Sequence, residues 1–464
     1  MLESAPLSSR NAHRQRAAEH LLAQLVCLGS HTITGVLSAC GRQFVDWSAD
    51  YRMYGRNRVE PEHLFDAVRK RLCEQDDGPI VVALDDTRVQ KSGKKVQGAK
   101  YMRDPMGPPF RVNFIWAQRF LQASMASTSA TGQARMIPVD WVHAPVPKKP
   151  GPKASKAKWK KYEAQRKATC ISRTGVERIH HLRNWLNENG AQGRPLWCVV
   201  DGSFTNETVL KNLPASTTLV GRIRSDANLY HLPEQQPIAR GRRRSYGPQA
   251  PTPEQLRRDD TRPWQHIEVF FGGKTRQLRV KRLGPVRWRK AGGHKDLQLI
   301  VIAPTSYRLT KNGRQLYRKP AYLICTAPDA PLDQVVQHYL WRWDIEVNFR
   351  DEKTLLGLGD AQVRTANAVQ NVTGLAVAAY AMLLTAAETC RHKNIPHQHL
   401  PAPKWRRKKA LRVTTMDLIQ NLRYELWATA IHFSHFASQP TKNTKPEKII
   451  DPLKNAVFYA STYS

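Results

Sequence analysis

The sequence predicts an α/β fold that is preceded by an N-terminal helical domain and interrupted by a β-rich insertion. Apolar residues recur at helical spacing through residues 1–75. Short continuous apolar runs follow, each typical of a strand that is buried on both faces of a sheet. Before the last of these runs, several segments alternate apolar and polar residues, which is the pattern of half-buried strands.

The N-terminal domain is predicted to span residues 1–75. Its apolar residues are spaced three or four positions apart, as on the buried face of a helix. They fall into three groups: Leu21, Leu22, Leu25 and Val26; Ile33, Val36 and Leu37; Leu64, Val68 and Leu72. This spacing predicts a small unit of short helices.

Three apolar runs define the predicted sheet of the α/β core, namely residues 79–84, 196–200 and 321–325. Asp85 and Asp86 follow the first run, Asp201 follows the second, and a proline-containing turn follows the third. Residues 111–123 are predicted to add a strand and residues 176–189 a helix. We therefore place the first part of the core at residues 76–225 and its second part at residues 319–395.

Three further segments are predicted to lie outside this core. Residues 147–167 are rich in Lys and Pro and predict a mobile surface loop. Residues 226–318 form the predicted β-rich insertion, because they contain the strand-like segments 267–271, 277–283, 297–303 and 315–317. The pattern is helical again from residue 332, and residues 396–464 form a C-terminal region.

Charge indicates the class of partner. The 464 residues include 73 Lys plus Arg and 38 Asp plus Glu, which gives a net charge of +35 and favours a polyanion. The basic residues are dispersed and do not gather on one amphipathic helix, so nucleic acid ranks above an anionic membrane. The first 16 residues lack the apolar stretch of a signal peptide, and the apolar run at 374–387 is short for a membrane helix. These patterns predict a soluble, intracellular protein.

Cysteines and glycines exclude two other classes of site. The seven cysteines form no C-x-x-C pair, so neither a zinc ribbon nor a disulfide framework is indicated. Residues 92–94 lack the upstream glycine of a phosphate-binding loop, so no nucleotide cofactor is expected.

Asp85, Asp86 and Asp201 follow predicted strands, and functional residues of α/β sheets gather beyond the carboxyl ends of strands. A single aspartate there is more often a turn former or a helix cap. Two strand ends that both carry aspartate favour a site for hard divalent cations, which prefer carboxylate oxygens. Adjacent strand residues point to opposite faces, so only one of Asp85 and Asp86 is expected to reach such a site.

A third acidic residue lies in a predicted helix that includes Gln337. Four polar side chains are offset by 3, 7 and 14 positions, which at roughly 100° per residue places them on one face: Tyr339, Arg342, Glu346 and Lys353. An apolar stripe runs along the edge of this face: Ile345, Phe349 and Leu356. Taken alone, the face has the pattern of a solvated helix with ordinary charge pairing, since Arg342 and Glu346 are four positions apart.

These residues carry a resemblance to a known family. The string Y-x-x-R-W-x-I-E-x-x-F-x-x-x-K-x-x-x-G, from Tyr339 to Gly357, resembles the YREK signature of bacterial DDE transposases of the insertion-sequence-four-like group. LDDTRVQKSGKKVQGAKY resembles the strand end that carries the first catalytic aspartate of that group, and VVDGSFTN resembles the strand end that carries the second. The order of the acidic residues, with a long insertion before the third, is also the group's. The motifs span about residues 80–365.

The resemblance implies a ribonuclease-H-like core and an N-terminal domain that binds DNA. It implies strand cleavage at insertion-sequence ends and strand transfer into target DNA, by a homodimer that binds the terminal inverted repeats. The catalytic residues would be Asp85, Asp201 and Glu346, holding two Mg²⁺ ions that Mn²⁺ can replace, with Asp86 as the alternative to Asp85. Two such ions can clamp the attacking and leaving oxygens of an in-line phosphoryl displacement. The expected location is the bacterial cytoplasm, on the nucleoid.

The other residues of the motif receive separate roles. Tyr339, Arg342 and Lys353 are predicted to bind DNA, because bidentate Arg and point-charge Lys suit backbone phosphates. Trp343 is predicted to pack in the core, with stacking on an unpaired base as the alternative. The remaining acidic residues of the helix point away from the shared face and are predicted to be bystanders: Asp344, Asp351 and Glu352.

Two alternative functions stay open at this point. A metal-dependent nuclease of the same fold would hydrolyse DNA without rejoining it, and sequence separates these two reactions poorly. A catalytically inactive, transposase-derived DNA-binding protein would usually have lost a carboxylate, whereas all three positions are acidic here.

Overall fold

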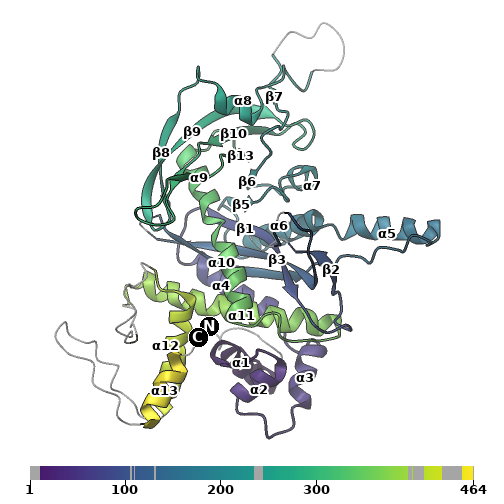
Figure 1. Cartoon of the computed structure of the whole chain (residues 1–464), viewed down its shortest axis with the longest axis vertical. Coiled ribbons are helices and arrows are strands. Elements are labelled where there is room, and N and C mark those ends of the chain that lie inside the picture. The colour runs from purple at the N-terminus through teal and green to yellow at the C-terminus, as the bar shows by residue number, and fades with distance from the viewer. Residues whose placement is uncertain are drawn as a thin grey trace, which may run out of the picture.

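The computed structural model describes residues 11–104, 107–108, 110–129, 132–234, 244–395, 400, 412–430 and 452–462. Within this part of the chain an eleven-stranded mixed sheet runs through the molecule and helices cover it (Figure 1). The sheet consists of a five-stranded core and an extension, and the two are continuous because β6 and β13 are hydrogen-bonded neighbours.

The core is built around β1 (Ile80–Gln90). β1 pairs antiparallel with β3 (Phe114–Thr128) and parallel with β5 (Leu196–Val200). β3 in turn pairs antiparallel with β4 (Ala134–His143), and β5 pairs parallel with β6 (Thr217–Arg222). The order β4-β3-β1-β5-β6, in which only the second strand along the chain opposes the others, is that of a ribonuclease-H-like core, so the predicted fold is confirmed. A short strand, β2 (Lys100–Arg103), pairs with the outer part of β3.

The extension contains the strands of the β-rich insertion. β13 (Ala321–Cys325) lies beside β6, and outward from it follow β10 (Asp296–Ile302), β9 (Lys274–Arg287), β8 (Gln265–Phe271) and the short β7 (Tyr230–His231). β11 (Ser306–Tyr307) and β12 (Leu316–Tyr317) form a separate hairpin, and α8 (Pro253–Arg258) packs against β10. The insertion therefore enlarges the same sheet.

Several strands differ from expectation, because β2, β4, β6, β7 and β11 were not predicted and β1 is longer than predicted. The strand predicted at residues 79–84 continues to Gln90, because its second half pairs with β3 after the pairing with β5 has ended. β4 contains Pro138 in its middle, and it lies at an edge of the sheet, where a proline is tolerated. Here Pro138 lies beside a register shift between Ala123 and Ser124 of β3, where the ladder is already irregular.

Residues 147–167 are not simply a loop. Their second half forms α5 (Lys156–Ala168), which begins at Ser155, whose side chain accepts a hydrogen bond from the Lys158 backbone N–H. The prolines and the glycine at 147–152 favoured a loop, and they do precede the helix. α5 leads into α6 (Ile171–Glu188), which confirms the helix predicted at 176–189.

The helical elements at the two ends of the chain lie side by side (Figure 1). The N-terminal helices are α1 (Asn11–Val26), α2 (Ile33–Ala39), α3 (Ser48–Gly55) and α4 (Pro61–Cys73). The C-terminal helices are α11 (Ala366–His392), α12 (Thr415–Ala430) and α13 (Pro452–Thr462). α11 is long and apolar enough to cross a membrane, but 67% of its most apolar window is buried, where it packs against α4 and β4. It is placed as a core helix.

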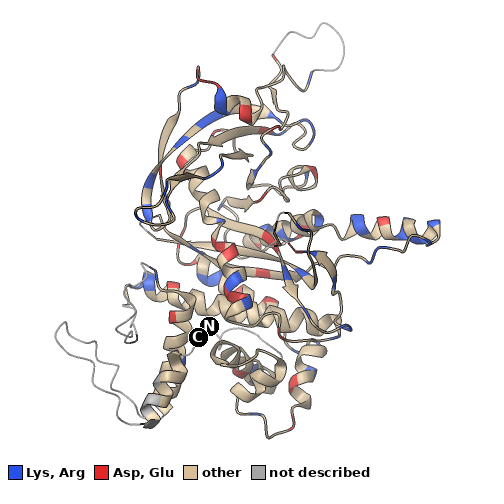
Figure 2. Cartoon of the chain, in the orientation of Figure 1, with Lys and Arg blue, Asp and Glu red and all other residues tan. Residues whose placement is uncertain are grey.

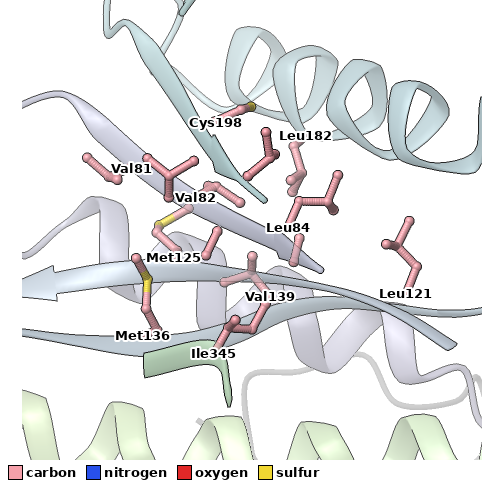
Figure 3. Close-up of a cluster of buried hydrophobic side chains, with 14 of the residues drawn as sticks. Val81, Val82, Leu84, Leu121, Met125, Met136, Val139, Leu182, Cys198 and Ile345 are labelled. Carbon is pink, nitrogen blue, oxygen red and sulfur yellow. The ribbon is translucent and has the colours of Figure 1, made fainter. Parts of the chain in front are cut away.

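The hydrophobic core lies on both sides of the central strands. Leu84 of β1 and Leu182 of α6 are part of it on one side of the sheet, and Val139 of β4 and Ile345 lie among the buried side chains around β3 and β4 (Figure 3). Ile345 belongs to α10 (Asp344–Thr354) and is fully buried. Its burial fixes the start of α10 against the sheet.

Candidate active site

Asp85 and Asp201 lie at the same edge of two neighbouring parallel strands. The parallel pairing of β1 with β5 ends at Leu84 and Val200, and the two aspartates are the next residues of their chains. Leu84 faces α6, so the alternation of side chains along a strand turns Asp85 to the opposite face, where α10 lies. The topology of the core therefore brings together two acidic residues that are 116 positions apart in the sequence.

The carboxylate of Asp85 is largely buried and lies close to the negative charge of Asp201. Its carboxylate accepts a hydrogen bond from the Asp86 backbone N–H, with 2.8 Å between N and Oδ1. Burial raises the pKa of Asp85 to about 7, and the negative charge of Asp201 adds to the effect. Arg342 opposes this shift, since its Nη1 lies 3.4 Å from Asp85 Oδ2.

Asp201 is oriented by the loop that follows it. Its Oδ1 accepts hydrogen bonds from the backbone N–H of Ser203 at 2.9 Å and from Ser203 Oγ at 2.6 Å. The backbone carbonyl of Asp201 accepts a further bond from Thr205 Oγ1 at 2.7 Å. This turn holds the carboxylate at the end of β5, and α7 (Glu207–Lys211) begins two residues after Thr205.

Glu346 joins the site through Arg342. Arg342 Nη2 lies 3.6 Å from Glu346 Oε1, so one guanidinium contacts both Asp85 and Glu346. The Arg342 side chain is 11% exposed, whereas that of Glu346 is 45% exposed. The cation is thus enclosed, and the third carboxylate can move in solvent.

Arg342 stands at a break between two helices, which the sequence did not predict. The predicted continuous helix is divided into α9 (Leu332–Trp341) and α10. At the break, the backbone N–H groups of four residues bond to carbonyls three positions earlier: Arg342, Trp343, Ile345 and Glu346. Such a 3₁₀-like turn inside a helix is frequent at functional hinges. It tightens the backbone at Arg342, so the single shared face deduced from 100° spacing is interrupted there.

Asp86 faces the other side of the sheet. Burial raises the pKa of Asp86, while the positive charges of Arg119 and Arg88 lower it. Arg119 Nη2 donates to the backbone carbonyl of Thr169, just before α6, at 3.4 Å. Asp85, and not Asp86, therefore shares a face with Arg342 and Glu346.

The other predicted site residues are divided between two places. The Tyr339 ring lies 5.7 Å from the Arg342 guanidinium, beside the acidic residues. Lys353 lies near the opposite end of α10, with its ammonium 5.9 Å from the Phe349 ring. Lys353 is exposed, and partial desolvation of its side chain lowers its pKa; the charge of Glu352 opposes this effect and that of Arg88 adds to it.

Two features of α10 and its N-terminus differ from the sequence prediction. Trp343 is 60% exposed, so its predicted place in the core is wrong: the tight turn at the helix junction points it outward. Glu352, predicted to be a bystander that points away from the shared face, is fully buried, and burial raises its pKa to about 8. Periodicity contained the signal for Glu352, because positions 345, 349, 352 and 356 form one apolar stripe.

The other two acidic residues of α10 have structural partners. Asp344 forms an ion pair with Arg412, with 2.9 Å between Nη2 and Oδ2. Asp351 is buried and accepts a hydrogen bond from Thr415 Oγ1 at 2.6 Å. Both partners come from the C-terminal part of the chain, so these residues hold α10 in place.

A basic cavity beside Asp201 was not anticipated. Its volume is about 1320 Å³, and Gly202 and Thr205 of the loop after Asp201 form part of its wall. The other side contains Trp288, two acidic side chains, Asp226 and Glu254, and five cationic side chains: Arg222, Arg224, Arg289, Lys290 and Lys319. Asp226 pairs with Arg224. The sequence signal was weak, because the cationic residues come from three separate segments. The cavity can accept an anionic chain next to the carboxylates.

The donor chemistry of the site fits a hard divalent cation. Asp85, Asp201 and Glu346 offer only carboxylate oxygens, which are the ligands that Mg²⁺ prefers. The pKa of Asp85 is raised first by burial and then by the negative charge of Asp201, and Arg342 supplies positive charge there. Among the residues that the structure describes, no group of three His, Cys, Asp or Glu side chains is arranged to hold an ion. Asp85 and Glu346 each contact Arg342 instead.

A cryo-EM structure of the piggyBac transposase synaptic complex with hairpin DNA aligns with 96% of this chain and 80% of its own, at 13% identity and a TM-score of 0.35. So low a score adds nothing to the strand order described above. No curated protein sequence is significantly similar to the chain.

One family model decides the class of protein. The model described as DDE superfamily endonuclease matches residues 5–295, a range that includes Asp85 and Asp201 and ends before Glu346. The match covers more than half of the 464 residues. The chain therefore belongs to the DDE superfamily endonucleases.

Proposed function

We propose that this endonuclease is a DNA transposase of the insertion-sequence-four-like YREK group, which cleaves DNA at the ends of an insertion sequence and transfers the cut strand into target DNA. One observation carries the proposal: Arg342 contacts both Asp85 and Glu346 at the edge where Asp85 and Asp201 end two parallel strands. This arrangement supports a role for all three acidic positions of the motif, and Tyr339 lies against the same guanidinium.

Asp85, Asp201 and Glu346 would hold two divalent ions, Mg²⁺ or Mn²⁺, whose chemistry is to activate the attacking oxygen and to stabilise the leaving oxygen at a phosphodiester. Cleavage and strand transfer are the same displacement with different attacking groups, a water in the first and a 3′-hydroxyl in the second. A single acidic site therefore suffices for both reactions. The half-exposed side chain of Glu346 can reorient to complete the site.

Arg342 has two alternative partners in this proposal. Without DNA its guanidinium pairs with Asp85 and Glu346. A DNA phosphate offers the same kind of bidentate acceptor, and transfer of Arg342 to it would release both carboxylates. Tyr339, whose ring supports the guanidinium, and Lys353 would hold the backbone on either side.

The DNA partner follows from charge and from the motif. A net charge of +35 favours nucleic acid, and the basic cavity beside Asp201 continues the site towards the insertion. We propose that the partners are the terminal inverted repeats and the target DNA, that the N-terminal helices contribute to DNA binding, and that the active assembly is a homodimer. In this reading the protein acts in the bacterial cytoplasm on the nucleoid.

The decisive experiment uses labelled linear DNA that carries the sequences flanking the coding region, incubated with the full chain, Mg²⁺ and a supercoiled target plasmid. The expected products are ends cut at a discrete position and a labelled plasmid that contains a joined end. Cut DNA without joined product would assign the chain to the alternative nuclease function. Binding without cleavage under Mg²⁺ or Mn²⁺ would assign it to the inactive, DNA-binding alternative.

Substitutions test which residues form the site. Asp85→Asn, Asp201→Asn and Glu346→Gln are each expected to reduce cleavage by 10³-fold or more, on the order of 4 kcal/mol in the barrier, with binding of end DNA unchanged within about threefold. Asp86→Asn is the matched control, because it removes a neighbouring carboxylate that faces Arg119. It is expected to retain at least about a tenth of the activity, roughly 1.4 kcal/mol or less. Full activity of Asp201→Asn or Glu346→Gln would remove that residue from the site.

A further inference from the structure

Residues 147–169, which we call the basic arm, project from the body of the molecule (Figure 1). The arm consists of an irregular segment and α5, and α5 contains no buried residue. Most helices of a folded chain are stabilised by packing an apolar face, and an isolated helix of this length is only marginally stable in water. Because α5 has no buried apolar face, packing against the body of the molecule does not account for its stability.

The arm is nevertheless braced. The rings of Trp159 and Tyr162 meet edge to face, with centroids 6.0 Å apart, and Lys149 Nζ lies 5.7 Å from the Trp159 ring. The irregular segment therefore folds back along α5. At the root of the arm, Lys100 Nζ donates to the Pro147 carbonyl at 3.2 Å. These contacts hold the arm outward from the body.

The charge of the arm is almost entirely positive. Residues 147–169 contain nine Lys or Arg and one acidic residue, Glu163, so the arm carries +8 of the net +35. Figure 2 shows this concentration along α5. Like charges lie three or four positions apart, as in Lys156 with Lys160 and Lys158 with Lys161, which weakens an isolated helix. A polyanion would remove that repulsion, so the arm is more stable when it is bound to one.

The root of the arm lies close to the loop that follows Asp201, on the face of the sheet that carries Asp86 and α6. Thr169, at its end, accepts a hydrogen bond from Arg119, which is close to Asp86. Three residues later Ser172 Oγ accepts a bond of 2.8 Å from Asn206 Nδ2, in the loop after Asp201. α5 has 13 residues and is therefore about 20 Å long, a length that spans about six base pairs of duplex.

We propose that the basic arm binds the phosphate backbone of duplex DNA outside the insertion sequence, on the flank of the scissile position. Lysines distributed on all sides of a helix suit phosphate contacts and provide no fixed geometry for reading bases. A surface that reads no sequence is suited to DNA whose sequence varies, which is the flanking or target DNA and not the repeated ends. The inference rests on the proposed function for the identity of this DNA.

The test compares an arm variant, which lacks four positive charges of the basic arm, with a control variant, which lacks four positive charges at other exposed positions. The arm variant is Lys156→Gln, Lys160→Gln, Lys161→Gln and Lys167→Gln, at four exposed positions of α5. The control variant is Lys274→Gln, Arg308→Gln, Lys311→Gln and Arg314→Gln, at four exposed positions around β8, β9, β11 and β12. Both are made in the full chain with Asp201→Asn, so that no DNA is cut. α5 buries nothing, so the melting temperature of the arm variant should equal that of its parent.

Affinity is measured against salt concentration for three duplexes: an arbitrary sequence, an end that stops at the cleavage position, and the same end with 20 base pairs of flank. For the arm variant we expect the salt slope on the arbitrary and flanked duplexes to fall by about 0.9 for each phosphate that the arm no longer neutralises. On the end without flank the slope should be unchanged. Arginine at the four positions should restore it, because the charge is retained.

Three outcomes would overturn the inference. Equal losses for the arm and control variants would show a general effect of net charge. A loss on the end without flank as large as on the flanked end would show that the arm binds the insertion sequence itself. An unchanged slope on the arbitrary duplex would show that the arm does not bind DNA. These readouts involve no chemistry, so a failure of cleavage or strand transfer in the wild-type protein is a separate result.

Discussion

Glu352 shows how a single side chain can be buried beneath an active-site helix at a cost to stability. Its residue is fully buried, with the Gln122 amide as the polar group beside its carboxyl. Burial disfavours the charged form more than Gln122 and Lys353 favour it, and raises the pKa of Glu352 to about 8. The side chain is therefore mostly protonated at neutral pH and packs in the stripe formed by Ile345, Phe349 and Leu356.

Replacing Glu352 by Gln should stabilise the protein at alkaline pH. The folded state holds the proton more tightly than the unfolded state, so the wild-type free energy of unfolding falls as pH rises from about 4.5 to about 8. Glutamine has no such transition. We expect the stability of Glu352→Gln relative to wild type to increase by on the order of 3 kcal/mol between pH 5 and pH 8.

Urea unfolding of both proteins at several pH values, in the presence of EDTA, measures this difference. The comparison between the two proteins cancels every other titrating group that the substitution leaves unchanged. A difference that stays constant with pH would show that Glu352 keeps an ordinary pKa in the folded protein.

At the scale of elements, the two cations predicted to bind DNA lie at opposite ends of α10. Arg342 precedes the helix and contacts Asp85 and Glu346, whereas Lys353 lies near its last turn and close to Arg88 of β1. The break between α9 and α10 sets the direction of Arg342 without moving Lys353. The helix can therefore contact a DNA strand at points on both sides of the acidic residues.

Lys353→Ala should weaken binding to end DNA without removing catalysis. We expect the salt slope to fall by about 1, which corresponds to one fewer phosphate neutralised by the protein. Arg350→Ala is the matched control, because Arg350 is exposed on the same helix and pairs with Asp351. An equal fall for the control, or an unchanged slope for Lys353→Ala, would show that Lys353 has only a structural role.

The elements that the sequence predicted are those whose signal is local. The apolar run at 321–325 is β13, and the alternating segments 267–271, 277–283 and 297–303 lie in β8, β9 and β10. The acidic positions could be predicted because they follow apolar runs or belong to a motif. The break at Arg342, the strand around Pro138 and the outward position of Trp343 depend on tertiary pairing. No periodicity within one segment encodes them.

At the scale of the whole molecule, α11 connects the N-terminal helices to the catalytic core. It packs against α1, α3 and α4 on the N-terminal side and against β4 and α10 on the core side. Asn371 Nδ2 donates to the Tyr54 carbonyl at 2.8 Å, and Thr373 Oγ1 accepts from Trp141 Nε1 at 3.0 Å. Two residues of α11 that are two positions apart thus form hydrogen bonds, one with the N-terminal helices and the other with the catalytic core. The N-terminal helices and the core should therefore unfold together.

Gly374→Ala tests this coupling, since Gly374 lies where α11 meets α4. A Cβ there would stand 2.8 Å from Pro61 Cγ and 3.0 Å from Pro61 Cβ, so one helix must shift. We expect a destabilisation of about 1–3 kcal/mol with a single unfolding transition in both far-UV and near-UV circular dichroism. Gly55→Ala is the control, because the added Cβ meets nothing within 4 Å, and it should be neutral or stabilise by up to about 1 kcal/mol. Two separate transitions, with only the first shifted by Gly374→Ala, would show that the N-terminal helices unfold independently of the core.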